Sequence, residues 1–243
     1  MRIDLIKGDC LEEMAKLPDN SIDLCLTDPP YGTTACKWDT VIPFEPMWEQ
    51  LHRIVKDNGA ICLFGSEPFS SALRMSNIKR FKYDWVWEKK KPTGQMQAKN
   101  KPLNIYEKIS VFTSASMAPN LGLQPCYYPE TVPIDRKMNM QNSEFLGSRK
   151  TRAYHQKKTG YPKNLIKFDN VMNKGFHPTQ KPVPLLEYLI KTYTLKGETV
   201  LDFTMGSGST GVAAKNLNRS FIGIEQDDKY FDIARQRIND SDD

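Results

Sequence analysis

A glycine-rich turn between a predicted strand and a predicted helix constrains this chain more than any other feature. The turn covers Met205–Gly211 and follows the apolar run Thr199–Phe203. A helical stretch, Val212–Leu217, comes next and leads into a second apolar run, Ser220–Glu225. Strand, glycine turn, helix and strand in this order are typical of a βαβ unit. The unit favours an open α/β fold that binds its ligand beside the turn.

The chemistry of this turn predicts a nucleoside-containing cofactor. Gly206, Gly208 and Gly211 satisfy the pattern G-x-G-x-x-G, in which glycines allow a tight turn and let a ligand approach the bare backbone. Glu225 follows Gly206 by 19 residues, at the carboxyl end of the next predicted strand, where its carboxylate can accept hydrogen bonds from ribose hydroxyls. The pattern alone does not separate NAD from S-adenosylmethionine (SAM). The alternative is a structural turn with Glu225 as an ordinary acid before a helix.

Alternation of strands and helices along 243 residues predicts the fold class. Residues 1–112 alternate short apolar runs with helical stretches, residues 113–175 lose that rhythm, and residues 176–243 recover it. We therefore expect an α/β, Rossmann-like and mostly parallel sheet with helices on both faces, plus a small irregular insert. In the first part, further strands are expected over 2–6, 21–27, 60–64, 83–87 and 105–113, and helices over 11–17, 44–54 and 70–75, with a turn at 56–59.

The insert is strongly basic, with ten lysines and arginines, few acids and several interleaved aromatic residues between 113 and 175. One interpretation is a solvated loop region. The other is a nucleic-acid surface, in which cations contact phosphates and aromatic or polar groups contact bases. The net charge of +5 and the pI near 8.8 permit an anionic partner without requiring one.

A second candidate site is the tetrapeptide Asp28-Pro29-Pro30-Tyr31, just after the predicted strand Ser21–Thr27. The prolines lack N–H donors and have a fixed φ, so they form a rigid segment whose carbonyls can accept hydrogen bonds. Asp28 adds a carboxylate and Tyr31 an aromatic face. Such a site suits a planar ring with an exocyclic amine, whose nitrogen becomes nucleophilic when both of its hydrogens are held. The alternative is an ordinary strand-to-loop turn.

With these residues, the chain resembles the amino-methylating DNA methyltransferases, which modify adenine at N6 or cytosine at N4. Asp28–Tyr31 matches their catalytic motif, 201–209 resembles their cofactor motif, and 176–182 resembles the segment before it. The order of the motifs resembles the β arrangement, which places target recognition in the basic segment. The resemblance implies that Asp28 and the Pro29 carbonyl bind the target amine, with Pro30 between them and Tyr31, and that Tyr31 stacks on the base. The cofactor residues that it implies are Asp9, Cys10, His177, Thr179, Lys181, Asp202, Phe203, Gly206, Ser207, Gly208 and Glu225.

One departure from the family pattern concerns the aromatic residue of the cofactor motif. Relatives usually have Asp-Pro-Phe before the glycine turn, whereas here Phe203 follows Asp202 directly. On a strand, a shift by one position turns a side chain to the other face. A second aromatic residue, Tyr230 or Phe64, is then the substitute that we consider for the cofactor contact.

The resemblance predicts a SAM-dependent enzyme that methylates adenine N6 in double-stranded DNA, as a monomer or a homodimer. Cytosine-N4 methylation is the nearest alternative, followed by methylation of RNA or protein amines. A nicotinamide-dependent dehydrogenase would explain the glycine turn but not Asp28–Tyr31. A DNA-binding module without catalysis would not need intact glycines.

The cysteines and histidines indicate the redox compartment and bear on whether the chain binds a metal. The five cysteines are an odd number without a Cys-x-x-Cys pair, and the amino terminus has no apolar signal segment, so free thiols in the cytoplasm are expected. The three histidines are far apart in sequence, which gives no support to a metal site. No apolar run approaches the roughly 20 residues that a membrane span needs.

Overall fold

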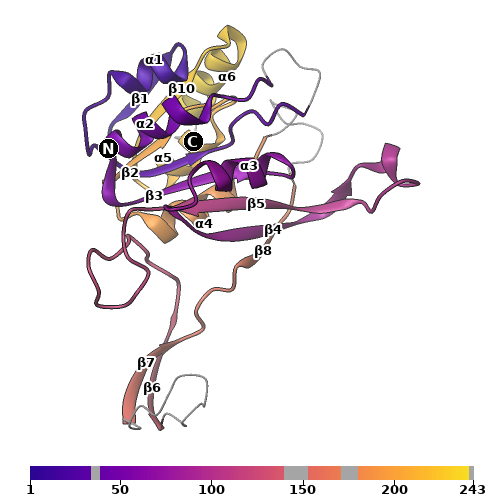
Figure 1. Cartoon of the computed structure of the whole chain (residues 1–243). Helices are drawn as coiled ribbons and strands as arrows, with labels where there is room; N and C mark the ends of the chain where they lie inside the picture. The colour runs from indigo at the N-terminus through magenta and orange to yellow at the C-terminus, as the bar shows by residue number, and fades with distance from the viewer. Residues whose placement is uncertain (34–38, 140–152, 171–179, 241–243) are drawn as a thin grey trace. The chain divides into compact units, whose positions relative to one another are not determined.

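The computed structural model describes residues 1–33, 39–139, 153–170 and 180–240. It contains two compact units, of which the larger combines Met1–Tyr127 with Asn164–Asp243 and the smaller covers Tyr128–Lys163. The larger unit holds an eight-stranded sheet in the order β1-β10-β9-β2-β3-β5-β4-β8 (Figure 1). Its strands are β1 (Ile3–Lys7), β2 (Ile22–Thr27), β3 (Val55–Gly65), β4 (Phe81–Thr93), β5 (Asn104–Phe112), β8 (Leu165–Phe168), β9 (Thr199–Asp202) and β10 (Ser220–Glu225).

The sheet is parallel except at β5, which is antiparallel to both of its neighbours, β3 and β4. Helices lie on both faces. The helices are α1 (Cys10–Ala15), α2 (Phe44–Ile54), α3 (Phe69–Ser76), α4 (Val183–Tyr193), α5 (Ser209–Asn216) and α6 (Asp228–Asn239). This architecture confirms the predicted Rossmann-like α/β fold.

The two hydrophobic cores follow from the period of two along the strands. In β3, Ala60, Cys62 and Phe64 pack with α4, α5 and α6, while Ile61 and Leu63 pack with α1, α2 and α3. All five side chains are nearly inaccessible to solvent. A strand that buries both faces reads as a continuous apolar run, which is why the sequence marks these central strands clearly.

The expected turn at 56–59 is instead part of β3, which begins at Val55 directly after α2. The pairing with β2 passes from Ile22↔Val55 to Leu24↔Ala60, so β3 carries three extra residues in a bulge. Gly59 lies at this bulge, where a Cβ would come 2.8 Å from the carbonyl oxygen of Asp23. Turn-forming residues therefore mark an irregularity within a strand here and not its start.

The βαβ unit has the predicted order, with β9, α5 and β10 side by side in the larger unit. Helix α5 begins at Ser209, three residues earlier than expected, because Gly208 caps it in a left-handed conformation with φ +78°. A Cβ on Gly208 would lie 2.9 Å from the Cβ of Ala234. This glycine therefore allows α6 to pack closely against the turn.

The smaller unit contains an antiparallel pair, β6 (Val132–Asn139) and β7 (Ala153–Thr159). It lies inside the basic segment 113–175, and its role in target recognition stays a prediction. In the part of the chain that the structure describes, we find no helix with both the length and the apolar character that crossing a bilayer requires.

Candidate active site

A cavity of about 650 Å³ lies at the carboxyl ends of β1, β2, β9 and β10. Open α/β sheets bind their ligands at this edge. Both constellations from the sequence contribute to its wall. The lining includes Asp9, Cys10, Asp28, Pro29, Pro30, Tyr31, Lys181, Asp202, Phe203, Gly206, Ser207 and Glu225.

Glu225 organises the glycine turn. Its Oε2 accepts a hydrogen bond from the Gly206 N–H at 2.9 Å, and its Oε1 accepts one from the Asp227 N–H at 2.9 Å. Burial raises the pKa of this carboxyl group above its ordinary value, while the two backbone donors oppose that shift. Gly206 has φ +51°, and nothing lies within 4 Å of the position that a Cβ would take. The turn thus presents open backbone next to a carboxylate.

Asp9 begins α1 next to Glu225, since the N–H of the preceding Gly8 donates to the Glu225 carbonyl at 3.1 Å. It is the N-cap of α1, and its Oδ1 accepts hydrogen bonds from the backbone N–H groups of Leu11 and Glu12 at 2.9 and 3.2 Å. The next residue, Cys10, has a thiol whose pKa is raised to about 12 by burial and by the charge of Asp9. A thiol with this pKa stays protonated, so Cys10 offers the cavity a small apolar surface and no nucleophile.

Asp202 connects the two constellations. Its Oδ1 accepts hydrogen bonds from Thr27 Oγ1 at 2.9 Å and from the Thr204 N–H at 3.2 Å, and Thr204 Oγ1 donates to the Asp28 carbonyl at 3.2 Å. Burial raises the pKa of Asp202 to about 6. Through these bonds the ends of β2 and β9 hold residues 28–31 against the segment that leads into the glycine turn.

Both oxygens of the Asp28 carboxylate already have donors. Tyr31 donates its hydroxyl hydrogen to Oδ1, and Lys181 Nζ lies 2.5 Å from Oδ2. Burial raises the pKa of Asp28 above its ordinary value, and the charge of Lys181 opposes that rise. A further donor to this carboxylate would therefore share its oxygens with Tyr31 and Lys181 or replace one of them.

A third carboxylate, Glu107 on β5, shares Lys181 with Asp28. Its Oε2 lies 3.3 Å from Lys181 Nζ, and its Oε1 lies 2.8 Å from Lys89 Nζ on β4. Burial opposes ionisation of Glu107, but Lys181 and Lys89 outweigh it and lower the pKa. Lys181 and Lys89 are both buried, so two cations and two carboxylates balance one another inside the site. Lys89 is therefore an internal ion-pair partner.

Asp39 is a further residue of the site that sequence reasoning missed. Its Oδ1 accepts hydrogen bonds from the N–H groups of Tyr31 and Gly32 at 2.8 and 2.9 Å, and its Oδ2 accepts one from Thr33 at 2.9 Å. The side chain is buried. One carboxylate thus fixes the backbone that follows the two prolines. The short polar run after Tyr31 gave no local signal for this role.

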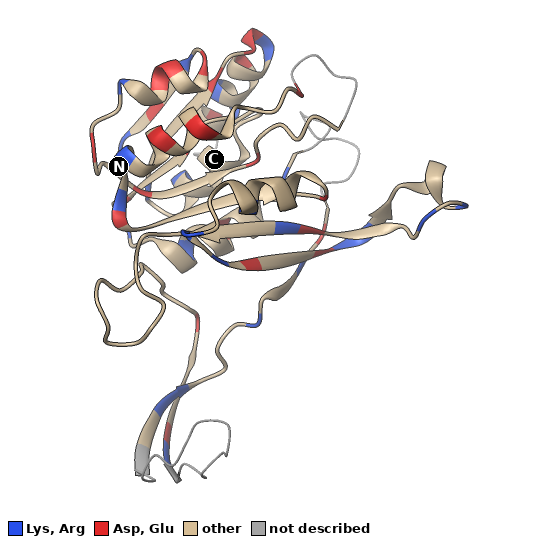
Figure 2. Cartoon of the chain, viewed as in Figure 1, with Lys and Arg blue, Asp and Glu red and all other residues tan. Residues whose placement is uncertain are grey.

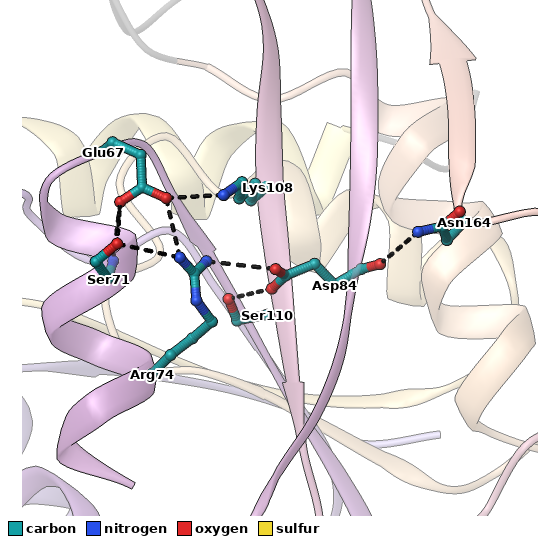
Figure 3. Close-up of polar contacts among 7 residues, drawn as sticks. All are labelled: Glu67, Ser71, Arg74, Asp84, Lys108, Ser110 and Asn164. Carbon is teal, nitrogen blue, oxygen red and sulfur yellow. Dashed lines mark hydrogen bonds and ion pairs between the residues drawn. The ribbon is translucent and has the colours of Figure 1, made fainter. Parts of the chain in front are cut away.

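The ring of Tyr31 is supported by α3. Phe69, the first residue of α3, stacks on Tyr31 with a centroid distance of 5.0 Å and an interplanar angle of 28°. Figure 3 shows how polar contacts join α3 to β4 and β5. Glu67 binds Arg74 at 2.9 Å and Lys108 at 2.8 Å, and Arg74 also contacts Asp84 at 3.3 Å. This network holds α3, and with it Phe69, against the sheet.

The remaining predicted residues differ in their placement. Ser207 lines the cavity, and its carbonyl and hydroxyl oxygens accept hydrogen bonds from Arg237 on α6. Phe203 is buried in the core that contains α1, α2 and α3, and it also lines the cavity. Tyr230 lines the cavity too. Gly208 packs against α6 and is absent from the lining. His177 and Thr179 lie outside the described residues.

A comparison with models of protein families shows which family contains both the tetrapeptide and the glycine turn. The family model of the N6/N4 DNA methylases matches residues 22–236. The chain belongs to this DNA methylase family. The matched range contains both the tetrapeptide and the glycine turn, so the resemblance inferred from those motifs is confirmed.

Two curated type II methyltransferases align with almost the whole chain. The type II methyltransferase M.HinfI of Haemophilus influenzae is 27% identical, over 97% of this chain and 68% of its own length. The type II methyltransferase M.HpaI of Haemophilus parainfluenzae is 26% identical, over 97% of this chain and 74% of its own length.

Solved structures share the fold. The M1.HpyAVI–SAM complex superposes with a TM-score of 0.65 at 24% identity and covers 98% of this chain and 99% of that one. The PvuII DNA methyltransferase, described as cytosine-N4-specific, gives a TM-score of 0.70 at 17% identity and covers 99% and 91% of the two chains. The family is SAM-dependent.

Proposed function

We propose that this DNA methylase transfers a methyl group from SAM to the exocyclic N6 of adenine in double-stranded DNA, in the cytoplasm. The observation that carries the proposal is one cavity with two carboxylates at the same edge of the sheet, one just after β2 and one at the end of β10. Asp28 and Glu225 both line it, and Asp202 connects their two loops through Thr27 and Thr204.

The residues around the glycine turn fit SAM. Glu225 offers carboxylate oxygens to ribose hydroxyls, and Gly206 leaves the backbone accessible beside them. Asp202 and Ser207 lie on the same wall and would face the amino-acid end of the cofactor. Asp9, at the start of α1, would face the adenine ring. The sulfonium of bound SAM supplies an activated methyl group, so the chain itself needs only to position the amine and manage its proton.

The tetrapeptide would receive a base that has been flipped out of the duplex. Stacking on Tyr31 compensates for the base stacking that is given up inside the duplex, on the order of 1–3 kcal/mol. The Asp28 carboxylate and the Pro29 carbonyl would accept hydrogen bonds from the two amine hydrogens, and the nitrogen lone pair is then available for in-line attack on the methyl carbon, whose bond to sulfur breaks. As the new N–C bond forms, the nitrogen becomes positively charged, and Asp28 stabilises this charge and accepts the proton.

The ion pair between Lys181 and Asp28 would open when the target amine binds to this carboxylate. Glu107 lies 3.3 Å from the same ammonium group and can hold it in the site, so the cation need not return to water. In the resting enzyme the charge of Lys181 favours the ionised form of Asp28, against the burial that raises the pKa of this carboxyl group.

We propose adenine and not cytosine as the target because the tetrapeptide begins with aspartate. Serine is commoner at this position in the cytosine-N4 enzymes that the chain resembles. The two amines are chemically alike, so a direct assay decides between them. Duplex DNA is incubated with the enzyme and labelled SAM and digested to nucleosides, which are identified by mass spectrometry. N6-methyladenine is the expected product, and N4-methylcytosine would refute the base assignment. Transfer to RNA or protein, with none to DNA, would refute the substrate class.

Asp28→Ala tests the mechanism in the same assay. We expect methylation to be lost while calorimetric SAM binding is retained, because Asp28 contacts the amine and not the cofactor. An active Asp28→Ala enzyme would contradict the role assigned to this carboxylate.

A further inference from the structure

Strands β4 and β5 continue beyond the hydrophobic core and form an exposed ribbon (Figure 1). We call residues 90–105 the β4–β5 arm. The two strands pair as far as Thr93↔Asn104, and a short 3₁₀ turn, η1 (Gln95–Gln97), lies between them. Every residue from 93 to 105 is exposed, and Met96 in η1 is fully so at 102%. This arm therefore contributes no core to the fold that displays it.

The charge of the arm is of one sign. It contains Lys90, Lys91, Lys99 and Lys101 and no aspartate or glutamate. Lys90 pairs with Asp169 at 2.9 Å, whereas no acidic side chain among the described residues pairs with Lys91, Lys99 or Lys101. Figure 2 shows these lysines along an otherwise uncharged ribbon. Glutamine and asparagine side chains, which can donate and accept hydrogen bonds, occupy much of the space between the lysines.

The base of the arm reaches the cavity. Lys89, Thr93 and Asn170 belong to the cavity wall. Asn170 contacts the backbone of Lys91 in both directions, accepting from its N–H and donating to its carbonyl, each at 3.4 Å. Internally, Lys89 is held by Glu107 at 2.8 Å. The arm is thus attached to the rim of the cavity that would receive a flipped base.

We propose that the β4–β5 arm is a DNA-binding element that grips the phosphate backbone beside the target base through Lys91, Lys99 and Lys101. The inference goes beyond the basic segment 113–175, and it rests on the proposed action on double-stranded DNA. A two-stranded ribbon has the width that a duplex groove accepts, and uncompensated lysines on such a ribbon match the negative charge of phosphates. The arm carries no acid that would repel the backbone.

The test is a triple variant, Lys91→Gln/Lys99→Gln/Lys101→Gln, compared with Lys79→Gln/Lys191→Gln/Lys196→Gln. The control lysines are also exposed, and they lie near the amino ends of strands, at the sheet edge opposite the cavity. Both variants lose three positive charges, so a general effect of net charge would affect them equally. Duplex binding is measured by fluorescence anisotropy between 50 and 300 mM salt, and circular dichroism confirms folding.

Each phosphate contact contributes about 0.9 to the slope of log affinity against log salt, so the arm variant should lose about 2.7 from that slope. At 150 mM salt this corresponds to binding weakened by about 100-fold. The control variant should bind nearly as the wild type does. The single-turnover methylation rate at saturating DNA should change little in either variant, because none of these lysines reaches the reacting atoms.

A second variant, Met96→Glu, probes the tip without removing a lysine. The side chain is fully exposed, so the fold should tolerate the change, and the added anion should weaken DNA binding by about tenfold through repulsion from phosphates. Equal salt slopes and affinities in the wild type, the arm variant and Met96→Glu would overturn the proposal. The wild type would still methylate DNA in that case, which separates this failure from a failure of the proposed function.

Discussion

Replacing Lys181 by methionine tests the charge arrangement of the site most directly. Methionine has similar length and no charge, so it leaves Asp28 and Glu107 with Lys89 as the one remaining cation of the cluster. Asp28 must be ionised to accept a hydrogen bond from the target amine and, after methyl transfer, a proton from the same nitrogen. We expect Lys181→Met to raise the pKa of Asp28 and thereby to move methylation to higher pH.

The magnitude follows from the geometry. Lys181 Nζ lies 2.5 Å from Asp28 Oδ2, and an opposite charge this close lowers a carboxyl pKa by about 1–3 units. Each unit corresponds to about 1.4 kcal/mol. Burial already raises the pKa of Asp28 in the presence of Lys181, so losing the cation adds to that rise. The acidic limb of the pH–rate profile should therefore move to higher pH by about 1–3 pH units, and the rate should fall about tenfold for each pH unit below the new pKa.

The assay is single-turnover methyl transfer to duplex DNA from pH 6 to 9.5, with calorimetric SAM binding as a check on the cofactor site. Lys89→Met is the matched control, because it also removes one buried cation but one that pairs with Glu107 and not with Asp28. Its profile should shift less. Lys181→Arg, which keeps the charge, should preserve the pH profile even if its different shape lowers the rate. A Lys181→Met profile that superposes on the wild-type profile would refute the reasoning.

Three further predictions concern residues that hold the site. Asp39→Ala should lower methylation with little change in SAM affinity, because three backbone N–H groups lose their acceptor and the loop after Tyr31 loosens; unchanged kcat would contradict this role. Gly208→Ala should destabilise the fold by about 1–3 kcal/mol in urea titrations, since φ is +78° and the new Cβ would meet Ala234 at 2.9 Å; wild-type stability would count against that close packing. Burial raises the pKa of Asp202 from 3.8 to about 6 in the folded chain, which therefore holds this proton more tightly than the unfolded chain, and the stability from this group should fall by about 2 kcal/mol as pH rises from 4 to 7. Asp202→Asn should remove that part of the pH dependence, and a wild-type slope in the variant would refute it.

Several features of the site could be predicted because their residues are neighbours in sequence. The turn around Gly206 and the acid at Glu225 belong to one βαβ unit, whose spacing places them together. The tetrapeptide at Asp28 follows a mostly apolar strand that is buried on both faces, and its prolines mark where that strand ends. Local patterns of this kind specify both the element and the loop that follows it, so the motif retains its meaning without the rest of the fold.

The sequence by itself determined the α/β class, the two motifs and the edge of the sheet where they meet. The tertiary structure alone decided that Lys181 is shared between Asp28 and Glu107, and that Lys89 is buried and not solvated. These groups come from the loop after β2, from β4, from β5 and from the segment before α4, and no local pattern in the sequence predicts that their charges pair. Their meeting depends on the strand order, which inserts the antiparallel β5 between β3 and β4. Ion pairs between distant strands depend on how the sheet is assembled, and that order follows from the packing of the whole core and not from any one segment.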